Sequence, residues 1–458
     1  MPDSRPEKLK SEIRRSLANS ALRSAVARAT ATTLAKRAAH VAAEPRWEAM
    51  RAAAARIKRE TVAHLDRYLA QFEAAATAAG IRVHWARDAA EACHHVRALA
   101  AAHGVTEVVK SKSMVTEEIG LNAHLERHGI EVVETDLGEF IVQLAGEPPS
   151  HLTAPALHKR REDIGRLFAE KLGVAFTDDP VALTALVRER LRGRFLRAGL
   201  GITGANFALA REGALVVVEN EGNALLTMNL PKRHVVVLGM ERLLPSIDEL
   251  PLFLDLLVVS ATGQAFPGYV SVLRGPTPPD RPGPDEVHVV VVDNGRSRML
   301  ARPEYRELLH CIRCGACLNV CPVYRQIGGH AYGWVVPGPI GAALIPLVLG
   351  LERGRDLPFA STLCGACADI CPVKIDLPGH LLRLRGDIAA AGLTGVAERL
   401  VVRSWAFAAR HPRIYRALTA LPRLLGRLPV RAWTATRDMP RPARRSFRRL
   451  WDEEERRP

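Results

Sequence analysis

The sequence CIRCGACLNVCP, residues 311–322, decides the fold of the second half of this chain. Its spacing, C-x2-C-x2-C-x3-C-P, is the run with which bacterial ferredoxins hold iron–sulfur clusters. Three cysteines spaced two residues apart can surround one cubane cluster, and the fourth, fixed by a proline, reaches a neighbouring cluster. We therefore predict a helical two-cluster ferredoxin-like module over residues 296–392.

A second run, STLCGACADICP at residues 361–372, repeats this pattern with serine in place of its first cysteine. Exchange of the fourth cysteine between the two runs predicts two [4Fe-4S] clusters. The first cluster takes Cys311, Cys314, Cys317 and Cys371, and the second takes Cys321, Cys364 and Cys367. One iron of the second cluster then has no cysteine. The open options for that iron are Ser361, His330, His380, a small exogenous ligand, or its absence in a [3Fe-4S] cluster.

Other uses of the cysteines fit this spacing less well. Zinc sites favour separated cysteine pairs and take four ligands each. Disulfides are rare in cytosolic proteins, where clustered cysteines are more often metal ligands. The eighth cysteine, Cys93, lies in a helical stretch of the preceding domain, and we expect it to be a small buried hydrophobic residue.

Short apolar runs alternate with helical periods from residue 81 onward, an order typical of βαβ units. It predicts an α/β domain with a mostly parallel sheet over residues 81–295, preceded by an N-terminal helical segment over residues 1–80. The predicted strands are 81–85, 105–110, 130–135, 214–219, 234–239, 254–260 and 287–293. The predicted helices are 88–103, 115–128, 304–309 and 377–391.

Polar, glycine-containing loops lie at the ends of several predicted strands. Because such loops line the ligand crevice of open α/β sheets, the candidate binding residues are Thr203, Asn206, Glu219, Asn220 and Asn223. Lys110, in the stretch KSKS at residues 110–113 between a strand and a helix, is a candidate for binding an anion. Tight turns and a solvated loop are the alternative explanations. The sequence shows no dinucleotide, ATP or hydrolase signature and no catalytic centre.

Positive charge is concentrated at the C-terminal end of the 458 residues. The formal net charge is +15, of which residues 399–458, with 16 Arg and 5 acidic residues, supply +11. An Arg-rich helical tail over residues 393–458 is either a docking element or a solvated surface. We expect no nucleic-acid binding, because no recognition element or stacking aromatics accompany the charge. Without a secretory signal or a transmembrane segment, the sequence predicts a cytoplasmic protein.

Further motifs surround the cysteines and extend along the chain. They are GITGANF at 201–207, ENEGN at 219–223, IGGHAYG at 327–333, PGPIG at 337–341, WTATRD at 433–438 and SF at 446–447. With the cysteine runs, they closely resemble the lactate utilization protein B family over nearly the whole chain. The resemblance implies a lactate-utilization domain, similar in fold to sugar isomerases and CoA transferases, fused to the two-cluster module. The family shares the seven-cysteine arrangement, so Ser361 is no departure from it.

The resemblance implies an iron–sulfur electron-transfer subunit in the oxidation of L-lactate to pyruvate. Its partners would be the other subunits of a lactate-oxidising complex and an electron acceptor that the sequence does not identify. One alternative is that the chain is itself a small-hydroxyacid dehydrogenase that holds its substrate at Lys110, Asn206 or Glu219. A second alternative is a redox-sensing binding module whose basic tail docks nucleic acid or an acidic partner.

Overall fold

Six parallel strands form the sheet that the βαβ pattern predicts. The computed structural model describes residues 8–425, 443 and 445–455. The strands lie in the order β1-β10-β7-β4-β2-β3, and every neighbouring pair is parallel. They are β1 (Arg82–Ala86), β2 (Glu107–Lys110), β3 (Glu131–Glu134), β4 (Leu200–Gly204), β7 (Arg233–Gly239) and β10 (Glu286–Val292). Five predicted strands are confirmed here, and β4 was not predicted.

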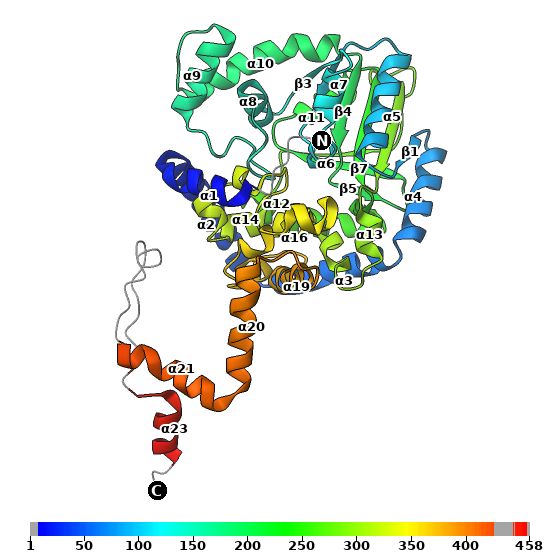
Figure 1. The fold of residues 1–458 in the computed structure, drawn as a ribbon. Coiled ribbons are helices and arrows are strands. Elements are labelled where there is room, and N and C mark those ends of the chain that lie inside the picture. The colour runs from blue at the N-terminus through cyan, green and yellow to red at the C-terminus, as the bar shows by residue number, and fades with distance from the viewer. Residues whose placement is uncertain (1–7, 426–442, 444, 456–458) are drawn as a thin grey trace. The chain divides into compact units, whose positions relative to one another are not determined.

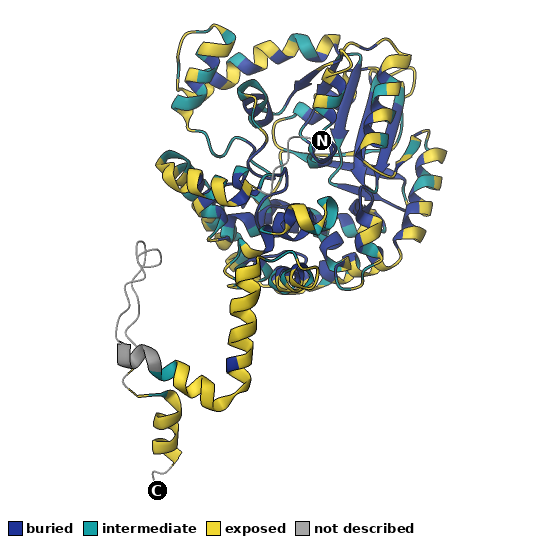
Figure 2. Ribbon diagram, viewed as in Figure 1, coloured by how far each residue is buried: buried dark blue, intermediate teal, exposed yellow. Residues whose placement is uncertain are grey.

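Both faces of this sheet are buried, which explains its valine-rich strands. Val108 of β2 and Ile202 of β4 belong to one apolar core with α5 (Ala89–Ala102), α6 (Met114–Ile119) and α7 (Leu121–Glu126). The adjacent Val109 belongs to a different core, formed with α8 (Leu137–Ala145), α9 (Arg161–Leu172) and α10 (Pro180–Arg197). Figure 2 shows the strands buried and the outer helices exposed on one side.

Helix α5 begins as predicted, because the Asp88 side chain accepts a hydrogen bond from the Glu91 N–H at 3.0 Å. The helix predicted over residues 115–128 is instead two helices. Gly120, with φ 69°, ends α6 in the left-handed conformation, and α7 starts directly after it.

A smaller sheet packs beside the first, and two predictions for this region are corrected. Its strands lie in the order β8-β5-β6-β9 and are β8 (Leu243–Leu244), β5 (Phe207–Leu209), β6 (Ala214–Glu219) and β9 (Tyr269–Leu273). The predicted strand 214–219 is β6, which pairs antiparallel with both of its neighbours and lies outside the parallel sheet. The predicted strand 254–260 is wrong, because these residues lie in helix α12 (Leu250–Thr262). Pro251 in its first turn and the left-handed Gly263 after its end delimit a helix that an apolar run alone does not distinguish from a strand.

The N-terminal helices and the cysteine-containing segment share one hydrophobic core. Helices α1 (Leu9–Ala18), α2 (Ser20–Ala43), α3 (Trp47–Ala63) and α4 (Leu65–Ala78) confirm a helical N-terminal segment. Leu9 and Val26 lie in the same core as Tyr324 and Leu344 of the later segment, although three hundred residues of chain separate them. That segment contains α14 (Ala316–Val320), α16 (Gly338–Leu349), α18 (Ala366–Asp369) and α19 (Leu377–Ala390), and Figure 1 shows α2, α14 and α16 below the large sheet. Of its two predicted helices, 377–391 is α19, and 304–309 is the short 3-10 helix η4 (Arg306–His310).

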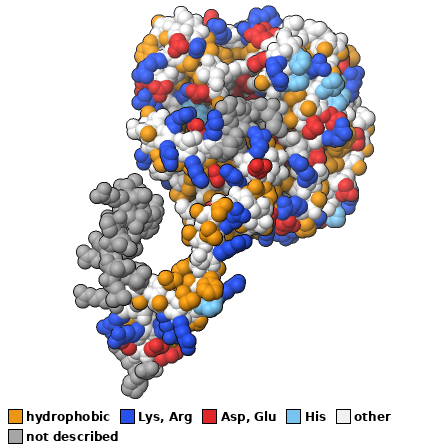
Figure 3. Space-filling model, viewed as in Figure 1, with side chains coloured by type: hydrophobic (Ala, Val, Ile, Leu, Met, Phe, Trp, Pro, Cys, Tyr) orange, Lys and Arg blue, Asp and Glu red, His pale blue; other side chains and the backbone are white. Residues whose placement is uncertain are grey.

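Contacts divide the chain into two units, with the boundary after Ile388. The second unit contains α20 (Val396–Arg410), α21 (Pro412–Leu425) and α23 (Phe447–Glu455), as a helical tail predicts. The motif at residues 433–438 lies outside the described residues. On the face of the first unit drawn in Figure 3, basic and acidic side chains are interspersed. Within the described part of the chain, no helix combines the length and apolar character needed to cross a membrane.

Candidate metal centre

The two cysteine runs adopt the same local backbone. In the first, Arg313 and Gly315 have φ of 60° and 79°, and in the second, Leu363 and Gly365 have φ of 54° and 87°. A left-handed conformation costs a residue with a side chain roughly 1–2 kcal/mol, so its repetition indicates a turn that the loop requires. Each glycine precedes a short helix, α14 or α18, that carries the third cysteine position of its run.

Ser361 occupies the place that Cys311 has in the first loop. The Arg313 N–H donates to Cys311 Sγ at 3.4 Å, and the Leu363 N–H donates to Ser361 Oγ at 3.1 Å. Both contacts join residue i to the N–H of residue i+2. The second loop therefore keeps the geometry of the first with an oxygen in place of the sulfur.

Cys371 of the second loop lies with three cysteines of the first. Cys311, Cys314, Cys317 and Cys371 line one small cavity, whose other walls are mainly apolar. Burial raises the pKa of Cys317 well above its usual value, and neighbouring Cys311 and Cys314 raise it further. Burial also raises the pKa of Cys371 to about 11. Four thiols that line one mainly apolar cavity match the donor set of an iron–sulfur cluster.

Cys321 of the first loop lies near two cysteines of the second. Burial raises the pKa of Cys367 to about 12, and the nearby Cys321 and Cys364 also raise it. Burial likewise raises the pKa of Cys321, with a smaller contribution from Cys364. Cys321 and Cys371 therefore each lie near cysteines of the other loop.

These sulfur atoms already accept hydrogen bonds of the kind that tune iron–sulfur clusters. Besides Cys311, Cys321 accepts from the Tyr324 N–H at 3.5 Å and Cys371 from the Ile375 N–H at 3.4 Å. All eight cysteines are free thiols. Seven of them fit the chemistry of iron–sulfur ligation. The eighth, Cys93, is buried as predicted and donates to the Ile119 carbonyl oxygen at 3.4 Å.

The second loop lies nearer to solvent than the first. Cys364 is exposed, whereas Cys314, at the same position of the first loop, is buried. A hydrogen bond from the Thr362 side chain lowers the pKa of Cys364, whereas burial raises the pKa of five other cysteines of the loops: Cys314, Cys317, Cys321, Cys367 and Cys371.

Both histidines that could have completed the second group have other partners. His330 Nε2 lies 2.8 Å from the Pro148 carbonyl oxygen, and its ring contacts that of His158 at 4.6 Å between centroids. His380 Nε2 lies 2.8 Å from a Glu307 carboxylate oxygen. Of the three candidate side chains, Ser361 is the one that occupies the loop position of a cysteine in the first run.

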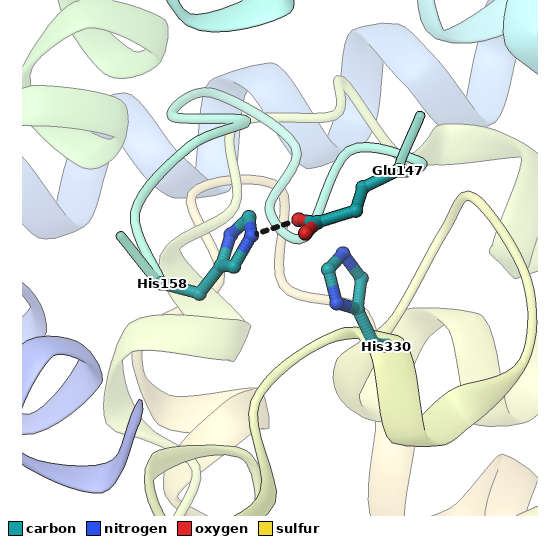
Figure 4. A group of neighbouring side chains, drawn as sticks. All are labelled: Glu147, His158 and His330. Atoms are coloured by element: carbon teal, nitrogen blue, oxygen red, sulfur yellow. Dashed lines mark hydrogen bonds and ion pairs between the residues drawn. The ribbon is translucent and has the colours of Figure 1, made fainter. Parts of the chain in front are cut away.

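Glu147, His158 and His330 form a second group of metal-ligating side chains, shown in Figure 4, with ligand atoms within 4.8 Å of one another. Their hydrogen bonds explain this group without a metal ion. His158 joins Ser150 Oγ at 2.9 Å to Glu147 at 2.7 Å, and Lys159 neutralises the same carboxylate at 2.8 Å. The group connects the loop after α8 to the segment after the first cysteines.

A cavity of about 280 Å³ lies at the carboxyl ends of the parallel strands. It brings together Asn206, Glu219, Asn220 and Asn223 of the residues predicted from the sequence. Lys110 and Thr203 lie outside it. The Lys110 ammonium is buried between Glu134 at 2.7 Å and Glu117 at 3.0 Å, and the Thr203 hydroxyl lies 2.8 Å from His234 Nε2.

The sequence did not single out two cationic residues of this cavity, Arg242 and Arg313. A third, Lys112, belongs to the predicted anion-binding stretch 110–113, and Ser113 after it is the N-cap residue of α6. Arg242 follows β7 in the 3-10 helix η2 (Met240–Arg242), for which no motif was present. Arg313 reaches the cavity from the first cysteine loop, a contact between domains that spacing does not reveal.

Three known families match most of the chain. Residues 69–292 match the LUD domain, residues 307–375 the 4Fe-4S dicluster domain, and residues 384–456 the C-terminal region of lactate utilisation protein B. The dicluster match contains both cysteine loops, which supports iron–sulfur clusters as their ligand.

Whole-length relatives are also similar. Lactate utilization protein B of Shouchella clausii is 44% identical over 416 residues, which cover 88% of this chain and 87% of that protein. The protein of the same name from Geobacillus kaustophilus is 44% identical over 451 residues, or 95% of this chain and 94% of that one. YkgF of Escherichia coli, described as an uncharacterized electron transport protein, is 42% identical over 408 residues, or 89% and 86% of the two chains.

Proposed function

Because the chain belongs to the lactate utilization protein B family, we propose that it is an iron–sulfur electron carrier in the oxidation of L-lactate to pyruvate. The observation that supports this proposal is that Cys371 lies with three cysteines of the first loop and Cys321 lies near two cysteines of the second. When bound, each cluster takes or gives one electron, so two clusters accommodate the pair released when a hydroxy acid becomes an oxo acid. In this proposal, residues 81–295 form the lactate-utilization domain and residues 296–392 the carrier module.

Two [4Fe-4S] clusters divide the seven cysteines of the loops. Cys311, Cys314, Cys317 and Cys371 hold the first cluster, and Cys321, Cys364 and Cys367 hold three irons of the second. Ser361 faces the remaining iron of the second cluster, supported by the N–H contact that it shares with Cys311. An alkoxide or hydroxyl oxygen is a weaker partner for iron than a thiolate, so this iron is the one most easily lost.

The surroundings of the two sites favour different tasks. Apolar walls bury the first site, and backbone N–H groups hold its sulfurs. The second site has the exposed Cys364 at its edge, where an external donor or acceptor can approach. We therefore assign the exchange of electrons with partner proteins to the second site.

The other subunits of a lactate-oxidising complex are the partners of this carrier in our proposal. The C-terminal unit is the proposed docking element, because its match at residues 384–456 is particular to lactate utilisation protein B and contains no cluster ligand. A chain that ends at residue 392 should keep its iron but fail to co-purify with co-expressed subunits. Retained co-purification would remove the docking role.

Iron and acid-labile sulfide per chain, measured after anaerobic purification, test the carrier function directly. We expect about eight irons, and two interacting low-temperature EPR signals after reduction by dithionite. A three-iron signal in the oxidised protein would place the incomplete site at Ser361. Stoichiometric zinc with little iron would overturn the proposal.

A further inference from the structure

The cavity of about 280 Å³ has a cationic wall whose charge is not fully neutralised by any side chain that the structure describes. Arg242 Nε and Arg313 Nη1 are buried, and neither has a hydrogen-bond partner among the described residues. The Arg242 side chain is 8% exposed and that of Arg313 is 11% exposed. Burial of a guanidinium nitrogen without a hydrogen-bond partner costs free energy. Because both nitrogens belong to side chains that line a cavity, this cost indicates a ligand there that supplies the missing hydrogen-bond acceptors.

The nearest carboxylate does not satisfy these two arginines. Glu241 Oε1 lies 3.8 Å from Arg242 Nε and 3.7 Å from Arg313 Nη2, beyond hydrogen-bond distance. The other oxygen of Glu241 accepts from Arg296 at 2.5 Å, and Arg296 also binds Glu118 at 2.8 and 3.0 Å.

Two carboxylates thus face three guanidinium groups in this buried cluster. Arg296 takes the close hydrogen bonds of both acids. The excess positive charge therefore lies on Arg242 and Arg313, the two arginines that line the cavity.

Neutral donors and acidic groups line other parts of the same cavity. Asn206 uses its amide oxygen to accept from the Val218 N–H at 2.9 Å, which leaves its NH2 group able to donate. Glu221 accepts from the Leu137 N–H with one oxygen at 3.2 Å, and its other oxygen can accept. A ligand with a hydroxyl or carbonyl oxygen near its charge matches this mixture. The volume lies at the small end of the usual range for ligand pockets.

We propose that this cavity binds a small hydroxy or oxo carboxylic acid, with its carboxylate on Arg242 and Arg313. Guanidinium groups bind carboxylates through paired, charge-assisted hydrogen bonds, which a single ammonium does not reproduce. The acid would lie beside the first cysteine loop, because Arg313 is two residues from Cys311 and the adjacent Ile312 lines both this cavity and the cysteine cavity. The lactate-utilization domain is then a binding domain for the organic acid, next to the carrier module.

Calorimetric titration of the iron-loaded, full-length protein with L-lactate, pyruvate and inorganic phosphate tests this inference. The choice of the two acids rests on the proposed function. We expect saturable binding of at least one acid, weakened about tenfold or more in Arg242→Gln and Arg313→Gln, as loss of a charge-assisted pair predicts. Arg192→Gln, which changes an exposed arginine of α10, is the matched control and should bind as the wild type does.

Three results would overturn the inference: no saturable binding of either acid by the wild type, equal affinity in Arg242→Gln and Arg192→Gln, or phosphate binding as tight as that of the acids. If Arg242→Gln does not fold, Arg242→Lys can be used instead. It keeps the positive charge but loses the paired N–H donors of the guanidinium, so it should still bind the acid more weakly than the wild type. Iron content measured on the same samples separates the two proposals. Intact clusters without acid binding refute this inference alone, whereas acid binding by protein that cannot hold clusters refutes the carrier function alone.

Discussion

The two cysteine loops share a backbone but differ in their surroundings. Both place a left-handed residue and a left-handed glycine before a short helix. The first loop is enclosed by the N-terminal helices and the α/β domain, and its Cys314 is buried. The second loop has serine at its first ligand position and an exposed Cys364. A repeated motif therefore fixes where ligands stand, while the packing around each copy determines how firmly they are held.

The largest effects are expected when the fourth cysteine of either run is removed. Cys371→Ala should remove the first cluster, although Cys371 belongs to the second run, and Cys321→Ala should damage the second cluster. Each variant should lose about half of the iron, because the remaining loop residues still hold the other cluster. EPR of the reduced proteins identifies the surviving cluster. If each mutation destroyed the cluster of its own run, the exchange would be wrong.

Ser361→Cys should remove the main chemical difference between the loops. The Leu363 N–H contact already directs this position as it directs Cys311, so a thiolate there should bind the fourth iron. We expect slower iron loss on mild oxidation and a weaker three-iron EPR signal than in the wild type. An unchanged signal would show that position 361 does not face the cluster. Ser297→Cys, at an exposed position of the short helix α13 (Arg296–Leu300), controls for an added thiol.

Two arginines hold backbone carbonyl groups of the second loop, one beside a cysteine of the proposed first cluster and one beside the second, which allows a matched pair of variants. Arg51 donates to the Cys371 carbonyl oxygen at 3.0 and 2.8 Å, and Arg385 donates to the Ser361 carbonyl oxygen at 3.0 Å. Arg51→Gln should speed the loss of iron to a chelator from the first cluster, and Arg385→Gln from the second. The change should be on the order of tenfold, since hydrogen bonds from charged groups contribute about 1.5–3 kcal/mol. If each variant speeded iron loss equally from both clusters, the two clusters would not be held independently.

The smallest effect is expected at Cys93, which lies outside both loops. Cys93→Ala should leave iron and sulfide per chain unchanged, because the thiol is buried in the apolar core of the α/β domain. Removal of one buried sulfur should lower the free energy of unfolding by about 1 kcal/mol. Loss of a cluster in this variant would identify Cys93 as the missing ligand.

Local patterns in the sequence predicted the fold where neighbouring residues determine it. The Asp88 cap, the valine-rich strands and the cysteine spacing all act within a few residues. The prediction failed at residues 254–260, because a leucine-rich apolar run suits either a buried strand or helix α12. It also missed the split at Gly120, where a single left-handed residue ends one helix and another begins.

The cavity shows why site residues were harder to predict than folds. Strand ends correctly indicated Asn206, Glu219 and Asn223 as lining residues. The same rule selected Lys110, whose two carboxylate partners come from residues 117 and 134 and bury it instead. Arg242 and Arg313 were missed because their role depends on the pairing of Arg296 with Glu118 and Glu241, a long-range contact set.

The exchanged cysteines also bear on the order in which the protein can mature. Residue 311 leaves the ribosome well before residue 371, yet the proposed first cluster requires both. Neither cluster can then be completed before the second loop has been synthesised. Delivery of iron and sulfide would be confined to a late stage of synthesis, and a chain stopped between the two loops would carry no finished cofactor.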